Sequence, residues 1–247
     1  MTAVTMLHEQ KLVYVQTPKV ASTSLIAATY RIAGVGYEGN KPRKIAQKRS
    51  FQEKLNKIGY VTEQFPPGNL EELRRKYDDY FWFCVKREPV KRLVSSYHNK
   101  IHRYAQLADR KAYFKGTLGK FSEGLKGIDN SRYLAMHVAK FISFEKMVDG
   151  LMNTGLDFDN HFKLQHKILN TDNVHYDMQL RQERLAEDFT KMCNQAGLGS
   201  ENYLGSQRLN ESKLPALQKV ELSDDIKRKI VHLYSSDFAK LGYPKPL

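Results

Sequence analysis

The hydrophobic positions of this chain gather in short apolar runs, two of which are followed by segments with helical spacing. The run at 11–16 contains Leu, Val, Tyr and Val, and the helical spacing after it covers 24–33, where two glycines end it. The run at 80–85 is aromatic and β-branched without alternation, which is typical of a strand covered on both faces. Pro89 then stands where a helix can begin. The pattern of strand, loop and helix therefore occurs twice.

Strands that alternate with helices in this way predict the fold class. We expect an α/β fold, a single P-loop-like domain over residues 1–247, with a central parallel β-sheet flanked by helices on both faces. Asn69 is expected to cap a helix that reaches Lys76, and Ser223 to cap the last helix. The other expected elements are a strand at 174–178 and helices at 131–140, 143–152, 183–196 and 223–241.

The charge of the chain narrows the class of partner. Its 40 Lys and Arg residues exceed its 27 Asp and Glu residues, giving a formal charge of +13. Such a balance predicts an anionic partner but fits a nucleotide, a nucleic acid, an acidic glycan and a membrane surface equally. The basic run at 41–57 predicts a mobile loop or a solvated helix, with recognition of an acidic acceptor as the alternative.

The hydropathy pattern and the number of cysteines argue against a membrane-spanning protein and against a disulfide-rich or zinc-binding scaffold. No apolar run reaches the roughly 18 residues that a spanning helix needs, and the N-terminus lacks a signal-peptide pattern. The two cysteines, Cys84 and Cys193, are too few for a disulfide scaffold or a cysteine-based zinc site, so we expect buried thiols.

A loop rich in hydroxyl groups follows the first predicted strand. Residues 17–24 read Thr-Pro-Lys-Val-Ala-Ser-Thr-Ser. A loop that leaves a strand and opens a helix turns its N–H groups toward an anion at the helix start. Residues 12–33 contain no glycine, so the loop differs from the G-x-x-x-x-G-K-[ST] loop that binds nucleoside triphosphates. It predicts a cradle for another phosphorylated donor, the alternative being an ordinary turn whose hydroxyls cap the helix.

A second loop with anion-binding chemistry follows the second predicted strand. Arg87 stands at the carboxyl end of that strand, and Ser95 comes eight residues later. Because ligands of parallel sheets bind outside the carboxyl ends of the strands, we expect both loops to flank one site. Arg87 can bind a phosphate through two N–H groups, and Ser95 can add a hydroxyl donor. Lys86, Lys91 and Arg92 are expected to contribute only to the field around the phosphates.

The two loops resemble the cofactor motifs of the sulfotransferases that use 3′-phosphoadenosine 5′-phosphosulfate (PAPS). The resemblance is closest to the carbohydrate branch, the Golgi-type family 2 and its bacterial relatives, whose second motif reads R-[DE]-P-x-x-R-L-x-S-x-Y. It rests on Pro18-Lys19-Val20-Ala21-Ser22-Thr23 and on Arg87-Glu88-Pro89 with Ser95. The segments at 209–213, 222–238 and 242–243 are similar to the closing pattern of that branch. Residues 37–75 and 103–155 match nothing and are expected to be inserted lid or acceptor-binding segments.

The resemblance implies the reaction and its donor site. PAPS would give a sulfuryl group to a hydroxyl of a carbohydrate, which is an oligosaccharide, a glycolipid or a polysaccharide, and leave 3′-phosphoadenosine 5′-phosphate (PAP). Arg87 and Ser95 would bind the 3′-phosphate, and Lys19 would stabilise the oxygen from which the sulfuryl group departs. No metal is expected to be required, because the sulfuryl group carries less charge than a phosphoryl group. The residues around the 5′ end of the donor would be Lys19, Val20, Ala21, Ser22, Thr23 and Ser24.

The acceptor hydroxyl needs a general base, and a histidine suits this role near neutral pH. His161 ranks first, because the segment Phe158-Asp-Asn-His-Phe-Lys-Leu-Gln165 resembles the family's D-x-H-[FW]-x-x-Q segment beside the acceptor site. His98 and His102 rank second. Asp159 and Gln165 are expected to orient His161 or to bind the acceptor. A structural, hydrogen-bonded histidine is the alternative for His161.

Two further function classes stay open. A P-loop-like nucleotide kinase shares the layout of strand, loop and helix, although the chain lacks the glycines and an evident Asp for Mg²⁺. A basic nucleic-acid-binding module fits the charge but lacks a recognition motif. The preferred hypothesis has a carbohydrate or glycolipid acceptor, no nucleic acid, no transmembrane segment and, as an option, peripheral membrane contact. It places the protein in a bacterial cytoplasm, or in the Golgi lumen if the chain is a trimmed eukaryotic sequence.

Overall fold

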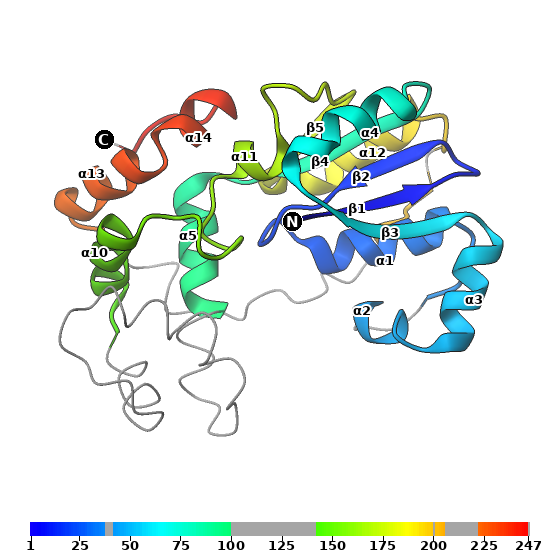
Figure 1. Cartoon of the computed structure of the whole chain (residues 1–247), viewed down its shortest axis with the longest axis horizontal. Coiled ribbons are helices and arrows are strands. Elements are labelled where there is room, and N and C mark those ends of the chain that lie inside the picture. Colours follow the sequence, from blue (N-terminus) through cyan, green and yellow to red (C-terminus); the bar gives the residue numbers. More distant parts are fainter. Residues whose placement is uncertain (38–41, 100–141, 200, 206–221, 247) are drawn as a thin grey trace. The chain divides into compact units, whose positions relative to one another are not determined.

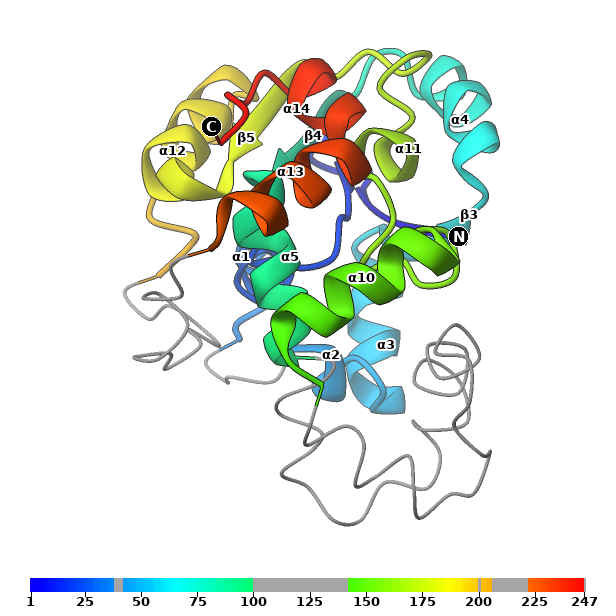
Figure 2. The ribbon, with the colours of Figure 1, turned by 90° about the vertical axis from the view of Figure 1, so that its left-hand side faces the viewer.

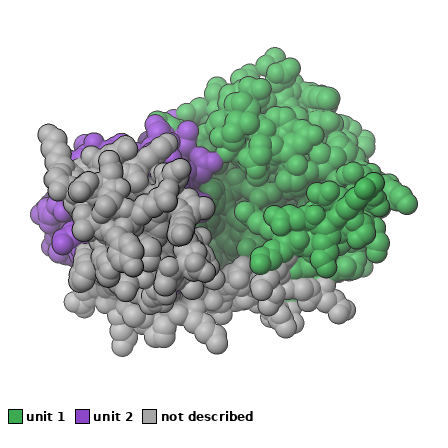
Figure 3. Space-filling view, turned by 60° about the horizontal axis from the view of Figure 1, so that its bottom comes forward, with its two compact units in different colours: residues 1–87, 165–213 green, residues 88–164, 214–247 purple. Residues whose placement is uncertain are grey.

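The computed structural model describes residues 1–37, 42–99, 142–199, 201–205 and 222–246. Two compact units divide the chain, Met1–Arg87 with Gln165–Lys213 and Glu88–Leu164 with Leu214–Leu247 (Figure 3). Each unit is composed of two stretches that are separated in sequence. The expectation of one domain stays a prediction. The expected helix at 131–140, His102 and the segment at 209–213 lie outside the described residues.

The first unit contains a mixed, mostly parallel sheet with the strand order β3-β1-β2-β4-β5 (Figure 1). Strand β2 is parallel to β4, and β4 is parallel to β5, whereas β1 is antiparallel to both β2 and β3. Among these strands β1 therefore runs against the other four. The strands are β1 (Thr2–Leu7), β2 (Leu12–Val15), β3 (Tyr60–Phe65), β4 (Phe81–Lys86) and β5 (Met178–Arg181).

Helices cover both faces of this sheet, as expected. Because successive strand residues point to opposite faces, Tyr14 and Phe83 pack in a core with α1, α3 and α12, and Val13 and Trp82 pack in another with α4 and α11. The helices of this unit are α1 (Ser22–Ile32), α2 (Pro42–Ile45), α3 (Arg49–Lys57), η1 (Pro67–Asn69), α4 (Leu70–Lys76), α11 (Gln165–Leu169), η4 (Gln182–Arg184) and α12 (Leu185–Gln195).

Several expectations for this unit need correction. The basic run at 41–57 forms α2 and α3, and it is not purely solvated because Phe51 and Leu55 pack in the core. The strand expected at 174–178 begins only at Met178, because Val174 closes a turn by donating its N–H to Asn170 O at 2.9 Å. Strands β1 and β3 were not predicted.

The thiols of the first unit are as expected. Cys84 and Cys193 are both buried and free. Burial raises the pKa of the Cys193 thiol to about 11 and raises that of Cys84 further, so both are protonated at neutral pH. They behave as small apolar side chains of the core.

The second unit is helical in its described part, and Figure 2 shows α5, α10 and α13 side by side. Ser143 caps α10 and Ser223 caps α13 with their hydroxyl groups. The single helix expected at 223–241 is divided at Tyr234, whose φ of −111° leaves the helical range. The elements are α5 (Pro89–Tyr97), α10 (Phe144–Thr154), α13 (Asp224–Leu233) and α14 (Ser235–Lys240). No described helix combines the length and apolar character needed to cross a membrane.

Candidate functional site

The first loop joins β2 to α1 through a strained backbone. Lys19 and Ala21 have φ angles of 70° and 68°, in the left-handed region that favours glycine. Each such residue costs about 1–3 kcal/mol, so the surrounding structure must hold the loop in place. Helix α1 starts at Ser22 after an N-cap, Ala21, that offers no side-chain hydrogen bond. The side chain of the N-cap residue therefore does not occupy the first turn, and a helix start of this kind, with the positive end of its dipole, favours an anion.

Contacts within and across the loop fix this shape. Ser22 Oγ donates to Thr17 O at 2.7 Å, so this hydroxyl braces the loop. Arg87 Nη1 donates to Lys19 O at 2.9 Å and thereby joins the second loop to the strained residue of the first. Thr17 is fully buried, and its Oγ1 has no hydrogen-bond partner among the described residues.

The end of β4 is fixed by a buried amide. Gln165, with none of its surface exposed, accepts a hydrogen bond from Arg87 N at 3.0 Å and donates to Arg87 O at 2.8 Å. Both backbone polar groups of Arg87 are therefore satisfied by one side chain. Gln165 was expected to orient His161 or to bind the acceptor, whereas the structure uses it to hold Arg87. A continuous series of contacts runs from Gln165 through Arg87 to Lys19.

Arg43 is a cation of the site region that the sequence did not single out. Its Nη2 donates to Gln16 Oε1 at 3.4 Å, and Gln16 Nε2 donates to Thr5 Oγ1 at 2.9 Å. Gln16 directly precedes the loop, so α2 brings a guanidinium group to the loop's start. Only the basic composition of 41–57 could have indicated this role, and it does not distinguish Arg43 from its neighbours.

The second unit begins with α5, which carries the remaining residues of the second motif. Glu88 caps this helix by accepting hydrogen bonds from Val90 N at 3.0 Å and Lys91 N at 2.7 Å. Ser95 lies on α5 with 9% of its surface exposed, and His98 is the C-cap of the helix.

Arg92 was expected to contribute only to the electrostatic field around the phosphates, whereas the structure shows that it makes specific hydrogen bonds. Its surface is 1% exposed, and its two terminal nitrogens donate to the carbonyl oxygens of Lys163 and Asn160. Desolvation lowers the pKa of this guanidinium, although an arginine keeps its charge in practice. Arg92 is therefore a specific structural contact of the second unit.

His161 forms a pair with Asp159 in the second unit. Asp159 Oδ1 lies 2.8 Å from His161 Nδ1 and also accepts a hydrogen bond from His161 N at 2.7 Å. The histidine side chain is 28% exposed. A carboxylate at Nδ1 favours the tautomer with the proton on that nitrogen, which leaves Nε2 able to accept a proton. The pair thus has the arrangement of a general base and its orienting group.

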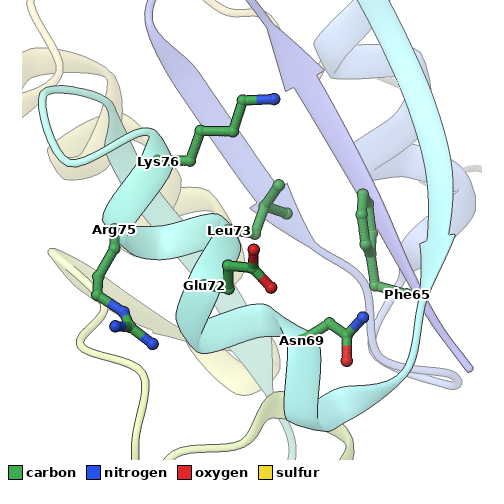
Figure 4. Close-up of a pocket in the computed structure, with 6 residues that line it drawn as sticks. All are labelled: Phe65, Asn69, Glu72, Leu73, Arg75 and Lys76. Carbon is green, nitrogen blue, oxygen red and sulfur yellow. The ribbon is translucent and has the colours of Figure 1, made fainter.

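One open pocket of the first unit lies away from these motifs. It sits between the end of β3 and α4 in the first unit, and Figure 4 shows Phe65 facing the side chains of α4 across it. Its lining residues are Phe65, Asn69, Glu72, Leu73, Arg75 and Lys76, and none belongs to either cofactor motif. Within the described part of the chain, no cluster of three or more His, Cys, Asp or Glu residues could hold a metal ion.

Comparison with known proteins identifies the family. Residues 2–244 match the model of the sulfotransferase family. The chain belongs to the sulfotransferase family. This sulfotransferase chain is 21% identical to carbohydrate sulfotransferase 11 of Rattus norvegicus and of Mus musculus over 247 residues, which cover 97% of the chain and 66% of each relative. Carbohydrate sulfotransferase 11 of Danio rerio is 21% identical over 250 residues.

The matched region covers nearly all of this chain but only part of each relative. The chain spans just under two thirds of the length of these curated relatives. No solved structure matches it significantly. Membership of the family favours sulfuryl transfer over the kinase and nucleic-acid alternatives, which receive no support from the comparisons. The expected cytoplasmic location receives none either.

Proposed function

We propose that this sulfotransferase chain moves a sulfuryl group from PAPS to a hydroxyl of a carbohydrate. The observation that carries the proposal is the hydrogen bond from Arg87 to Lys19 O, because it joins the two cofactor motifs at a strained loop that opens α1. A glycine-free cradle at a helix start fits an anionic donor. Family membership and the similarity to carbohydrate sulfotransferases support the donor and the acceptor class.

The donor would be bound mainly by the first loop. The backbone N–H groups from Val20 to Ser24 and the hydroxyls of Thr23 and Ser24 are the proposed partners of the 5′-phosphosulfate. Arg87 would bind the 3′-phosphate with guanidinium nitrogens other than the one that holds Lys19 O. The assignment of Ser95 to the same phosphate rests on the family motif that contains it.

The proposed reaction is a direct displacement at sulfur. The acceptor oxygen forms a bond to the sulfur atom while the bond between sulfur and the bridging oxygen breaks, and that electron pair stays on the phosphate of PAP. The ammonium group of Lys19 would stabilise the growing negative charge on the bridging oxygen, an effect worth about 3–4 kcal/mol for a preorganised donor. His161 Nε2 would take the hydroxyl proton, assisted by Asp159 at Nδ1. His98 is the second candidate for this base.

The acceptor is proposed as a carbohydrate hydroxyl on an oligosaccharide, a glycolipid or a polysaccharide. The similarity to carbohydrate sulfotransferase 11 supports the carbohydrate class. A glycolipid acceptor would bring the protein to a membrane surface, where the formal charge of +13 favours anionic lipids.

Ligand-dependent thermal unfolding tests the donor assignment. PAP without Mg²⁺ is expected to raise the melting temperature, because a ligand that binds only the folded state stabilises it. Arg87→Ala should abolish this shift, and Lys91→Ala, which removes an exposed cation outside the proposed contacts, should retain it. Stabilisation by ATP with Mg²⁺ but not by PAP would instead support a kinase.

A further inference from the structure

The segment that carries His161 is irregular in backbone yet firmly held on its carbonyl side. Arg92 Nη2 donates to Asn160 O at 2.8 Å, and Arg92 Nη1 donates to Lys163 O at 2.9 Å. One buried guanidinium therefore spans the segment and satisfies its first and last carbonyl groups. The two bonds diverge from a planar group, a geometry that lysine cannot reproduce.

Two further side chains hold the carbonyl groups between them. Ser96 Oγ donates to His161 O at 2.8 Å, and Tyr234 Oη donates to Phe162 O at 2.8 Å. Residues 160–163 thus have four successive carbonyl groups, each of which accepts a hydrogen bond from a side chain. Backbone carbonyls mostly bond to other backbone groups, so this arrangement is not an ordinary consequence of folding.

The buried charge of this cluster is also linked to the histidine. Arg92 lies within electrostatic reach of Tyr234, Asp237 and Asp159, which favour its charged form against the desolvation that lowers its pKa. Asp237 is fully buried. Asp159 therefore acts on two groups, the guanidinium of Arg92 and the ring of His161.

This cluster gives a role to motif residues that take no part in donor binding or in proton transfer. Arg92 comes from the second cofactor motif, whereas Tyr234 and Asp237 come from the closing C-terminal motif. In the proposed function neither Tyr234 nor Asp237 touches the donor or the acceptor. Tyr234 bonds directly to the segment that presents His161, from more than 70 residues away in sequence, and Asp237 acts on Arg92, which bonds to the same segment.

We propose that Arg92, Ser96 and Tyr234 are positioning residues for His161. This inference rests on the proposed function, in which His161 is the general base. Proton transfer requires the base within hydrogen-bond reach of the acceptor hydroxyl, and a misplacement of about 1 Å can cost about 100-fold in rate. The backbone of this segment is a turn in which Phe162 N and Lys163 N donate to Asp159 O at 2.9 and 3.0 Å, and the four carbonyl contacts add the side-chain support that fixes the position of the ring.

The test uses two substitutions that each remove one hydroxyl group. Tyr234→Phe removes the bond to Phe162 O, and Ser96→Ala removes the bond to His161 O at 2.8 Å together with that to Arg92 O at 3.0 Å. Each is expected to lower kcat about tenfold, with the KM for PAPS and the PAP affinity unchanged, because the base moves and the donor site does not. Tyr176→Phe is the matched control, since Tyr176 Oη donates to a backbone carbonyl, Leu169 O, at 2.6 Å from a buried ring in the first unit.

Each outcome of this test has a separate meaning. A similar loss of melting temperature in Tyr234→Phe and Tyr176→Phe, with a loss of kcat in Tyr234→Phe alone, supports positioning. If Tyr234→Phe and Tyr176→Phe have the same kcat, the inference is overturned. The proposed function still stands in that case, provided that the wild-type protein transfers sulfate and His161→Ala loses this activity. If His161→Ala retains wild-type kcat, the assignment of the base is wrong and the inference is overturned with it.

Discussion

The loss of the Gln165 side-chain amide should weaken donor binding at the first loop, because this amide holds the backbone of Arg87, which in turn bonds to Lys19 O. Gln165→Leu removes the two hydrogen bonds to Arg87 N and Arg87 O, at 3.0 and 2.8 Å, and keeps a buried side chain of similar size. Two backbone groups at the end of β4 then lack partners, at about 1–3 kcal/mol each. The expected loss of stability is about 2–6 kcal/mol, or roughly 4–24 °C in melting temperature.

The same substitution should reach the donor through Arg87. Its guanidinium holds the carbonyl of Lys19, whose φ of 70° the loop must maintain against strain. We expect the affinity for PAP to fall at least tenfold, equivalent to about 1.4 kcal/mol. Isothermal titration calorimetry with PAP at a temperature where both proteins are folded measures this directly.

A buried hydrogen bond elsewhere in the first unit provides the control. Thr2→Val removes the bond from Thr2 Oγ1 to Ile168 O at 2.9 Å. This variant should lose about 1 kcal/mol of stability and keep its affinity for PAP. Wild-type PAP affinity in Gln165→Leu, or an equal loss of affinity in Thr2→Val, would refute the series of contacts from Gln165 through Arg87 to Lys19.

Three other predictions concern strain, the base and alkaline stability. Ala21→Gly should stabilise the ligand-free protein by about 0.5–1 kcal/mol in thermal unfolding, because φ is 68° at this position, and a destabilised variant would contradict the strain. Asp159→Asn should move the acidic limb of the pH–rate profile to lower pH and reduce kcat, because the carboxylate stabilises the protonated ring of His161; an unchanged profile would remove Asp159 from the mechanism. Burial raises the pKa of the Tyr60 hydroxyl from 10.0 to about 12. Because the pKa is higher in the folded state than in the unfolded state, the contribution of this group to the free energy of unfolding is fully present below pH 10 and is lost as the pH rises toward 12. The loss is about 2–3 kcal/mol for this group, so Tyr60→Phe should unfold less steeply with pH above 10 in denaturant titrations, and an identical slope would contradict the assignment.

Much of the fold could be predicted from sequence because its elements have strong local patterns. The apolar run of β4 and the proline that starts α5 are examples, as is Ser223 at the start of α13. Strand β3 escaped prediction because it is an edge strand whose Thr62 and Glu63 are exposed, which leaves little apolar alternation.

The motif residues of the site could be predicted from the sequence, but the residues that hold them in place could not. The loop around Lys19 and the residue Arg87 have residue types that point to anion chemistry. The partner of Gln165 could not be predicted, because it is the backbone of Arg87, 78 positions away. Every residue has the same backbone groups, so the sequence does not indicate which of them a side chain will bind. The same holds for Arg92, where the positive charge suggested a field on phosphates and the structure shows bonds to carbonyl oxygens.

Transfer of labelled sulfate from PAPS to a panel of glycans and glycolipids tests the central claim most directly. The wild-type chain is predicted to add one sulfate to at least one carbohydrate acceptor, detected by the radiolabel and by mass spectrometry. Lys19→Ala should lower the transfer rate by about 100-fold or more, the usual effect of removing one preorganised charge from a transition state, while remaining folded. Wild-type transfer rates in Lys19→Ala would contradict the assignment of Lys19 to the departing oxygen.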